Sequence, residues 1–242
     1  MRRNRPPKKS DVSSRVNPRA TRADLMGQRE DIITACKKLE ADGLNRGASG
    51  NVSMRDRDHM LITPSAVGYD VIAPDMIARM RLDDDSGGWE GPNKPSSEWR
   101  FHRDILRGRS DINAVVHTHA PYATILAIAR KPIPAVHYMI AAFGGPDIRV
   151  CDYARYGTAE LSEHILVAME GRNGCLMANH GMVVGASDLT RALWLAGELE
   201  ALAHQYVHTL AIGGPVLLSD AEIEETAKGF ESYGVQAKDT AQ

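Results

Sequence analysis

Residues 112–119 constrain the fold of this chain more than any other stretch. Their sequence, INAVVHTH, is apolar and rich in β-branched residues, which is typical of a strand. Alternate residues of a strand point to the same face, so His117 and His119 are expected to converge on one point. A second apolar run contains His180, followed directly by Gly181, where a strand can turn and let another group approach closely.

These three histidines predict a metal site. A single histidine on a strand is usually a core residue, and spacing alone is weak evidence for a ligand. The pairing of His117 with His119 weakens that interpretation, and the surrounding residues favour a metal. Three neutral imidazoles with an open fourth position are the ligands of a catalytic zinc ion. The sequence therefore predicts Zn²⁺ bound by His117, His119 and His180.

A carboxylate precedes the histidine strand by one helix. In PSSEWRFHRDIL, Ser96 and Ser97 are expected to cap a helix over residues 97–107, with Glu98 in its first turn. Alone, Glu98 would be only a helix-start residue. If this helix packs beside the strand, its N-terminus brings a carboxylate, two hydroxyls and free amides to the metal. That combination suits proton abstraction next to a carbonyl, so Glu98 is a candidate catalytic base.

Two further turns could contribute to an anion site. The loop RGASGNVS (46–53) can present backbone amides, although most glycine-rich loops are only turns. The segment Thr-Pro-Ser-Ala at residues 63–66 is a second polar turn, and Ser96 with Ser97 forms a third.

Helical and strand patterns alternate along most of the chain. Strands are expected at residues 51–55, 60–64, 112–119, 135–140 (AVHYMI), around 147–150, and within 174–185 with a break at His180-Gly181. Helices are expected at residues 23–42, 97–107, 121–130, 158–170, 188–212 and 219–232. This order predicts an α/β fold with helices on both faces of a sheet. The pattern does not distinguish a parallel sheet from an antiparallel one.

Composition agrees with one domain preceded by a tail. Residues 1–22 contain eight Lys or Arg, one Asp and three Pro, so a disordered basic tail is expected there. Residues 23–242 carry a formal charge of −9 and are expected to form a single enzyme domain. We expect neither a nucleic-acid nor a membrane partner, because no apolar run is long enough for a span. Three scattered cysteines without a secretory signal favour the cytoplasm.

In combination, these motifs resemble the class II aldolase/adducin family. The resemblance rests on GLNRGASGNVSMR (43–55), MLITPSAVGYD (60–70), KPSSEWRFHRDI (94–105), INAVVHTHAPYATILAI (112–128), KPIPAVHYMIAAFGG (131–145), YGTAELSEHI (156–165), ANHGMVVG (178–185) and LTRALWLAGELEALAHQYVHTLAI (189–212). So many motifs in one order are far more specific than any single motif. The resemblance implies an α/β/α sandwich with a mostly antiparallel central sheet, and one zinc ion per subunit on the three histidines.

The resemblance also implies a phosphate site. In the family, residues matching Asn51, Ser65, Ala66, Ser96 and Ser97 hold the phosphate of the substrate. This chain has Thr-Pro-Ser-Ala where members that cleave fuculose phosphate have Thr-Pro-Thr-Gly. Ser65 keeps the hydroxyl, and Ala66 keeps the backbone amide unless that position requires a positive φ.

Two tyrosines gain a role only through the resemblance. Tyr138, in an apolar run, would otherwise be a packing residue. The matching family residue reaches the zinc site of a neighbouring subunit and donates a proton to the aldehyde oxygen. Tyr233 matches a mobile tail residue that closes over the substrate. The implied assembly is a homotetramer with sites between subunits, and we expect His102 and His137 to be structural.

The implied activity is reversible cleavage of a ketose 1-phosphate to dihydroxyacetone phosphate and a small aldehyde. The first expectation is L-fuculose 1-phosphate, which gives L-lactaldehyde. An alternative is a salvage enzyme for 5-deoxyribulose 1-phosphate or 5-methylthioribulose 1-phosphate, which present the same reacting atoms. L-ribulose-5-phosphate 4-epimerases have Asp where Glu98 stands, so this glutamate favours an aldolase. An adducin-like scaffold is disfavoured because all three histidines and Glu98 are present.

Overall fold

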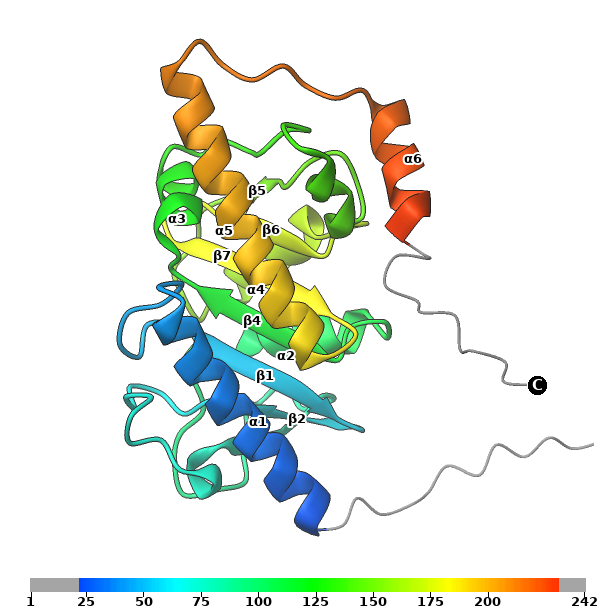
Figure 1. Ribbon diagram of the computed structural model, residues 1–242. Helices are drawn as coiled ribbons and strands as arrows, with labels where there is room; N and C mark the ends of the chain where they lie inside the picture. The colour runs from blue at the N-terminus through cyan, green and yellow to red at the C-terminus, as the bar shows by residue number, and fades with distance from the viewer. Residues whose placement is uncertain (1–21, 231–242) are drawn as a thin grey trace, which may run out of the picture.

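The computed structural model describes residues 22–230, and its centre is one seven-stranded sheet (Figure 1). The strands, in their order across the sheet, are β3 (Ala78–Arg81), β2 (His59–Ile62), β1 (Asn51–Asp56), β4 (Ala114–Thr118), β7 (Gly181–Ala186), β6 (Gly174–Met177) and β5 (Val150–Cys151). All neighbours pair antiparallel except β5 and β6, which run parallel. The expected α/β fold with a mostly antiparallel sheet is confirmed.

Helices cover both faces of this sheet (Figure 1). One face carries α1 (Arg22–Ala41), α3 (Pro121–Ile128) and α5 (Leu189–Ala211), and the other carries α2 (Trp99–Gly108) and α4 (Ala159–Ala168). Each face has its own apolar core because strand side chains alternate. On β4, Ala114 and Val116 pack with the first set of helices, and Val115 packs with the second. The central strands are therefore buried on both sides.

Three short elements complete the fold. They are the 3₁₀ helices η1 (Pro74–Met76) and η2 (Tyr138–Phe143), and the last described helix, α6 (Asp220–Phe230), which packs against η2. Between residues 22 and 230, no helix has the length and apolar character needed to cross a membrane. The expected basic tail, residues 1–22, lies outside the described residues apart from Arg22, where α1 begins.

One expectation about secondary structure was wrong, and one strand was not expected at all. Residues 135–140 form no strand; instead η2 begins at Tyr138. The His137 side chain accepts a hydrogen bond from the Met139 amide, which favours a helical turn over an extended chain. A short apolar run does not by itself separate these two conformations. The sequence pattern also failed to indicate β3, which is only four residues long.

The N-terminus of α2 also differs from expectation. The helix begins at Trp99, with Glu98 at its N-cap and no side chain hydrogen-bonded as a cap. Ser96 and Ser97 therefore do not cap it. The Ser96 hydroxyl instead accepts a hydrogen bond from the Glu98 amide, one residue before the helix (3.3 Å).

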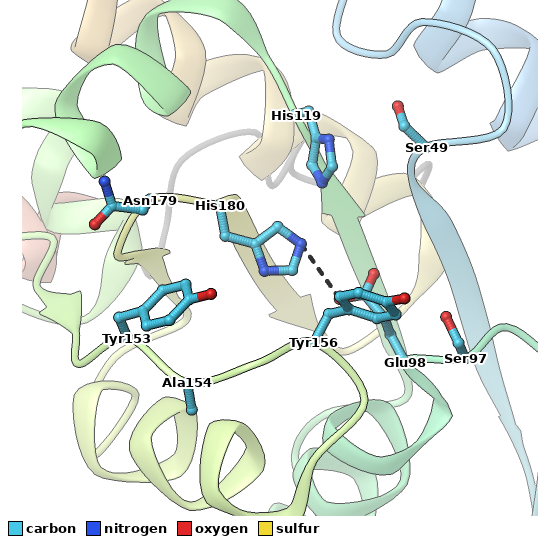
Figure 2. A pocket seen from close by; sticks show the side chains of 9 residues that line it. All are labelled: Ser49, Ser97, Glu98, His119, Tyr153, Ala154, Tyr156, Asn179 and His180. Carbon is cyan, nitrogen blue, oxygen red and sulfur yellow. Dashed lines mark ion pairs between the residues drawn. The ribbon is translucent and has the colours of Figure 1, made fainter.

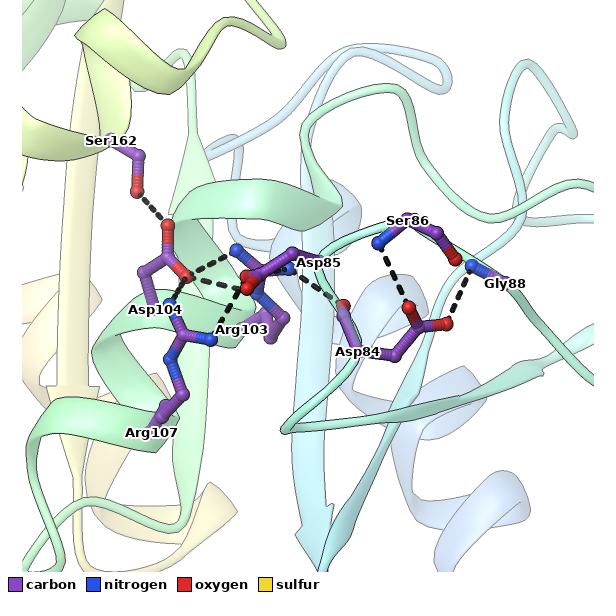
Figure 3. A network of polar contacts seen from close by, with 8 residues as sticks. All are labelled: Asp84, Asp85, Ser86, Gly88, Arg103, Asp104, Arg107 and Ser162. Atoms are coloured by element: carbon purple, nitrogen blue, oxygen red, sulfur yellow. Dashed lines mark hydrogen bonds and ion pairs between the residues drawn. The ribbon is translucent and has the colours of Figure 1, made fainter.

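A polar network fixes α2 in place (Figure 3). The Arg103 guanidinium is 2% exposed and donates hydrogen bonds to the Asp104 carboxylate (2.7 and 2.9 Å) and the Asp84 carbonyl (2.7 Å). Asp104 also accepts a hydrogen bond from the Ser162 hydroxyl on α4 (2.7 Å). These contacts tie α2 to α4 and to the loop after β3.

The strand register brings distant segments to one end of the sheet. Asn51, the first residue of β1, pairs with His117 on β4. Thr118 on β4 pairs with Met182 on β7, a strand that begins directly after His180. This end of the sheet therefore gathers the polar residues that the sequence singled out.

Candidate metal centre and active site

Three histidines converge where β4 ends and β7 begins. His117 lies on β4, His119 follows its last residue, and His180 precedes β7. Their ligand atoms all lie within 4.8 Å of one another, and their ring centroids are 4.8 to 5.0 Å apart. This geometry could hold one metal ion.

Local contacts orient these rings. Nδ1 of His117 lies 2.8 Å from the Met182 carbonyl, and a hydrogen bond donated there leaves Nε2 facing the site. Nε2 of His119 is buried without a hydrogen-bond partner among the described residues. A Cβ on Gly181 would lie 2.5 Å from the Thr118 carbonyl oxygen and 2.9 Å from Cδ2 of His119, so this close approach requires glycine. A buried, unpartnered imidazole nitrogen is expected of a metal ligand, and the residues fit a metal ion.

The Glu98 carboxylate points between the histidines. Its Oε2 lies 3.2 Å from Nε2 of His117. Its Oε1 lies 3.3 Å from Nε2 of His180, the ion pair drawn in Figure 2. Asn51 donates a hydrogen bond from Nδ2 to Oε2 (3.0 Å). Glu98 is only 6% exposed. The structure therefore brings this carboxylate together with all three histidines.

The charges in this cluster depend strongly on one another. Burial alone would raise the pKa of Glu98, but the charge and hydrogen bond of His117, the charge of His180 and the Asn51 amide hold that pKa well below its usual range. Burial alone would lower the pKa of His117, yet Glu98 raises it. Burial and the charge of His117 lower the pKa of His119 and that of His180 to about 4. At neutral pH, Glu98 is thus a carboxylate, and His119 and His180 have the neutral form that binds metals.

A cavity of about 360 Å³ opens beside the histidines (Figure 2). Its lining residues are Ser49, Ser97, Glu98, His119, Tyr153, Ala154, Tyr156, Asn179 and His180. Tyr153 and Tyr156 are more than half exposed, so they form the outer part of the lining. Sequence reasoning assigned no role to Ser49, Tyr153, Tyr156 or Asn179. The only available signal was their position in loops next to the recognised motifs.

Comparison with known protein families identifies the chain's relatives. Residues 30–207 match the profile of the family described as Class II Aldolase and Adducin N-terminal domain. The chain belongs to the class II aldolase/adducin family.

Individual relatives extend this match over nearly the whole domain. A 5-methylthioribulose-1-phosphate/5-deoxyribulose-1-phosphate aldolase of Rhodospirillum rubrum is 49% identical over 210 residues, covering 87% of this chain and 94% of the relative. An L-fuculose phosphate aldolase of Escherichia coli is 45% identical over 209 residues, covering 86% and 96%. The solved structure of an L-fuculose 1-phosphate aldolase matches with a TM-score of 0.81 and 42% identity, covering 84% and 95%. The expectation that the chain is a class II aldolase, and hence a lyase, is confirmed.

The expected phosphate residues of this class II aldolase lie on adjoining turns. The Ser65 amide donates a hydrogen bond to the Lys94 carbonyl (3.0 Å), and the Ser96 amide donates to the Thr63 carbonyl (2.9 Å). Ser97 lines the cavity, whereas Ser96 is buried behind it. Ser96 and Ser97 directly precede the N-terminus of α2, and of their two hydroxyls the one on Ser97 is therefore open to a ligand.

Ala66 adopts the left-handed backbone conformation, with a φ of 56°. This is the condition under which a glycine is preferred, and a residue with a Cβ costs about 1–2 kcal/mol there. The aldolase therefore keeps the turn at Ala66 with a strained backbone.

The Asn51 side chain lies between Glu98 and His102. It is not among the lining residues, and its amide bonds Glu98 on one side and His102 on the other. His102 is fully buried, and burial together with the charge of His117 lowers the pKa of His102 to about 3, so its ring is neutral. Nδ1 of His102 lies 2.7 Å from the Ser53 hydroxyl. The Asn51 side chain is thus bonded to Glu98 and does not face the cavity.

Tyr138 lies on η2 and is not among the residues that line the cavity. It is 49% exposed, and its ring lies 6.5 Å from that of Phe230 on α6. The neighbouring His137 caps η2, in keeping with its expected structural role. Tyr233, the expected lid residue, lies outside the described residues. The roles of both tyrosines stay predictions.

Proposed function

We propose that this chain is a zinc-dependent aldolase that reversibly cleaves a ketose 1-phosphate to dihydroxyacetone phosphate and a small aldehyde. The observation that carries this proposal is the buried Glu98 carboxylate beside three converging histidines and an open cavity. One zinc ion per subunit would be held by His117, His119 and His180, because such imidazole sets are typical of catalytic zinc. When bound, zinc supplies Lewis-acid stabilisation of negative charge on the substrate oxygens.

Side chains of the protein move the protons. Breaking the C3–C4 bond leaves its electron pair on C3 and releases the proton of the C4 hydroxyl. In the synthetic direction the Glu98 carboxylate removes a proton from C3 of dihydroxyacetone phosphate, and in cleavage the Glu98 carboxyl group, protonated beforehand from solvent, delivers a proton to C3. Tyr138 of a neighbouring subunit accepts the C4 hydroxyl proton in cleavage and returns it to the aldehyde oxygen in synthesis. This balance requires one acid–base group on each side of the broken bond.

The phosphate is assigned to the adjoining turns beside the cavity. Ser97 lines the cavity, and Ser96, Ser65 and Ala66 lie on turns that are hydrogen-bonded to one another. Hydroxyls and backbone amides of such turns can hold an anion. Asn51 was also expected here, and its side-chain amide is bonded to Glu98 and His102.

The assembly is proposed to be a homotetramer with shared sites. Tyr138 supports this because it is half-exposed and absent from the lining of its own cavity. Tyr233 is proposed to close over the substrate. The three cysteines are buried free thiols, which supports the reducing cytoplasm as the compartment.

Two substrate groups are candidates. The 49% identity to the R. rubrum enzyme supports 5-methylthioribulose 1-phosphate or 5-deoxyribulose 1-phosphate as the first choice. L-fuculose 1-phosphate, the first expectation from the motifs, is supported by 45% identity to the E. coli enzyme.

A coupled assay for dihydroxyacetone phosphate tests the proposal. The purified protein, with its zinc content measured, is supplied with each of the three ketose 1-phosphates and with L-ribulose 5-phosphate. We expect one equivalent of zinc and release of dihydroxyacetone phosphate from at least one ketose 1-phosphate. Epimerisation of L-ribulose 5-phosphate without cleavage of any ketose 1-phosphate would assign the chain to the epimerases. Absence of both bound metal and activity would indicate an adducin-like scaffold.

A further inference from the structure

A buried line of three polar side chains leads to the catalytic carboxylate. The Ser53 hydroxyl lies 2.7 Å from Nδ1 of His102, and Nε2 of His102 lies 2.5 Å from Oδ1 of Asn51. Nδ2 of Asn51 donates to Oε2 of Glu98 at 3.0 Å. Ser53 and His102 are 0% exposed, and Asn51 is 4% exposed. Water therefore cannot replace these hydrogen bonds, and the members depend on one another.

The donor and acceptor atoms of these side chains allow the hydrogen bonds in this line to run in only one direction. An ionised carboxylate only accepts hydrogen bonds, so Asn51 must turn its NH₂ group to Glu98. Its carbonyl oxygen then faces His102, whose Nε2 must carry the proton. Because the ring is neutral, its Nδ1 is an acceptor, and the Ser53 hydroxyl donates a hydrogen bond to it. A reversed Asn51 amide would place oxygen against the carboxylate and NH₂ against the protonated Nε2.

Among the described residues, Asn51 is the only side chain that bonds this carboxylate and is not itself a proposed metal ligand. Within residues 22–230, the other side chains with an ion pair or hydrogen bond to this carboxylate are His117 and His180. Both of these are proposed metal ligands, so they cannot fix Glu98 separately from the metal. Oriented donors that hold a base in place contribute to the rate by avoiding reorganisation during the reaction.

We propose that Ser53, His102 and Asn51 form a positioning chain that holds the Glu98 carboxylate at C3 of the substrate. Asn51 is then a positioning residue for the base. This inference rests on the proposed aldolase function, in which Glu98 transfers the C3 proton.

Exchange of the C3 hydrogen of dihydroxyacetone phosphate with D₂O tests the chain without any aldehyde. Asn51→Asp keeps the shape but replaces the donor to Glu98 with a negative oxygen. At saturating dihydroxyacetone phosphate, exchange should fall on the order of a hundredfold, with the half-saturating concentration within about threefold of wild type. Ser97→Ala should show the opposite pattern, a raised half-saturating concentration with a nearly unchanged maximal rate.

Variants of the histidine separate positioning from folding. His102→Leu removes the donor to Asn51, and His102→Gln can restore a donor near the position of Nε2, so exchange should fall in the first and recover in the second. Ser162→Ala controls for the general effect of losing a buried hydrogen bond. The Ser162 hydroxyl donates to Asp104 at 2.7 Å, the length of the Ser53–His102 bond, and Ser162 is not among the residues that line the cavity. The exchange rate of this variant should equal that of wild type even though its stability falls.

The protonation state of His102 gives a second readout that does not depend on activity. The positioning chain requires the Nε2-protonated tautomer, which ¹⁵N NMR identifies, with His102→Gln assigning the signal. An Nδ1-protonated ring would overturn the inference. So would an Asn51→Asp variant with wild-type maximal exchange and a raised half-saturating concentration, because that pattern places Asn51 on the phosphate. No exchange by the zinc-loaded wild type would instead refute the aldolase function itself.

Discussion

At the scale of a single residue, His119 allows the proposed metal centre to be tested. Its Nε2 is buried and unpartnered among the described residues, and its ring lies 5.0 Å from those of both other histidines. His119→Ala should therefore lose tightly bound zinc and cleavage activity, while the fold survives because the residue lies beyond the end of β4. His208→Ala, at an exposed histidine of α5, is the matched control and should keep its zinc. A full equivalent of tight zinc in purified His119→Ala would remove this assignment.

The sequence predicted the three histidines of this site but not the contacts of Asn51, and the reason is physical. The histidines could be found because they stand at fixed positions relative to two apolar runs, and a strand end projects such residues together. The bond between Asn51 and Glu98 joins residues 47 positions apart, and that between Asn51 and His102 spans 51. No local pattern encodes such contacts. Ala66 was correctly identified as the position where φ matters, but its positive φ came only from the structure.

At the scale of elements, the loop before β1 depends on one buried tyrosine. The Tyr69 hydroxyl donates to the Gly50 carbonyl and accepts a hydrogen bond from the Asn45 amide, both at 2.8 Å. Tyr69→Phe leaves both partners buried and unsatisfied, so the free energy of unfolding should fall by about 1–3 kcal/mol at pH 7 in urea titrations. Tyr153→Phe, at an exposed tyrosine, should change it by less than about 0.5 kcal/mol.

The same tyrosine gives this prediction a pH dependence. Burial raises the pKa of Tyr69 above its usual value of 10. Above pH 10 the unfolded chain therefore releases a proton that the folded chain retains, and wild-type stability falls as pH rises. The Tyr69→Phe variant has no ionisable hydroxyl at this position. The difference in free energy of unfolding between variant and wild type should therefore narrow above about pH 10. A constant gap up to pH 11 would show that the hydroxyl is not held in this way.

Elements with a long, clear period were predicted well, and short ones were not. The helices expected at 158–170 and 188–212 correspond to α4 and α5, because an apolar face repeated over several turns is unambiguous. Residues 135–140 were assigned to a strand, whereas η2 begins within them. The antiparallel arrangement could not come from the alternation of elements, since it depends on which strands pair. It came from the family resemblance.

At the scale of the whole molecule, Tyr138 tests whether the sites are shared. If it acts in a neighbouring subunit, Tyr138→Phe and His119→Ala should each be nearly inactive alone. Co-assembled, some interfaces pair the intact histidines of one chain with the intact tyrosine of another, so activity should reappear in the mixture. Sedimentation gives the oligomeric state. A fully active monomer at nanomolar concentration, or mixed oligomers that never regain activity, would show that Tyr138 does not act between subunits.

The central claim is that Glu98 transfers the C3 proton beside a zinc ion held by three histidines. The most direct measurement is C3 hydrogen exchange of dihydroxyacetone phosphate in D₂O, with zinc-loaded wild type and Glu98→Gln. This exchange needs no aldehyde, so it does not depend on which ketose 1-phosphate is the substrate. We predict exchange by the wild type and a loss on the order of a hundredfold or more in Glu98→Gln, with the half-saturating concentration retained. Wild-type exchange rates in the variant, or no exchange by the zinc-loaded wild type, would contradict this account.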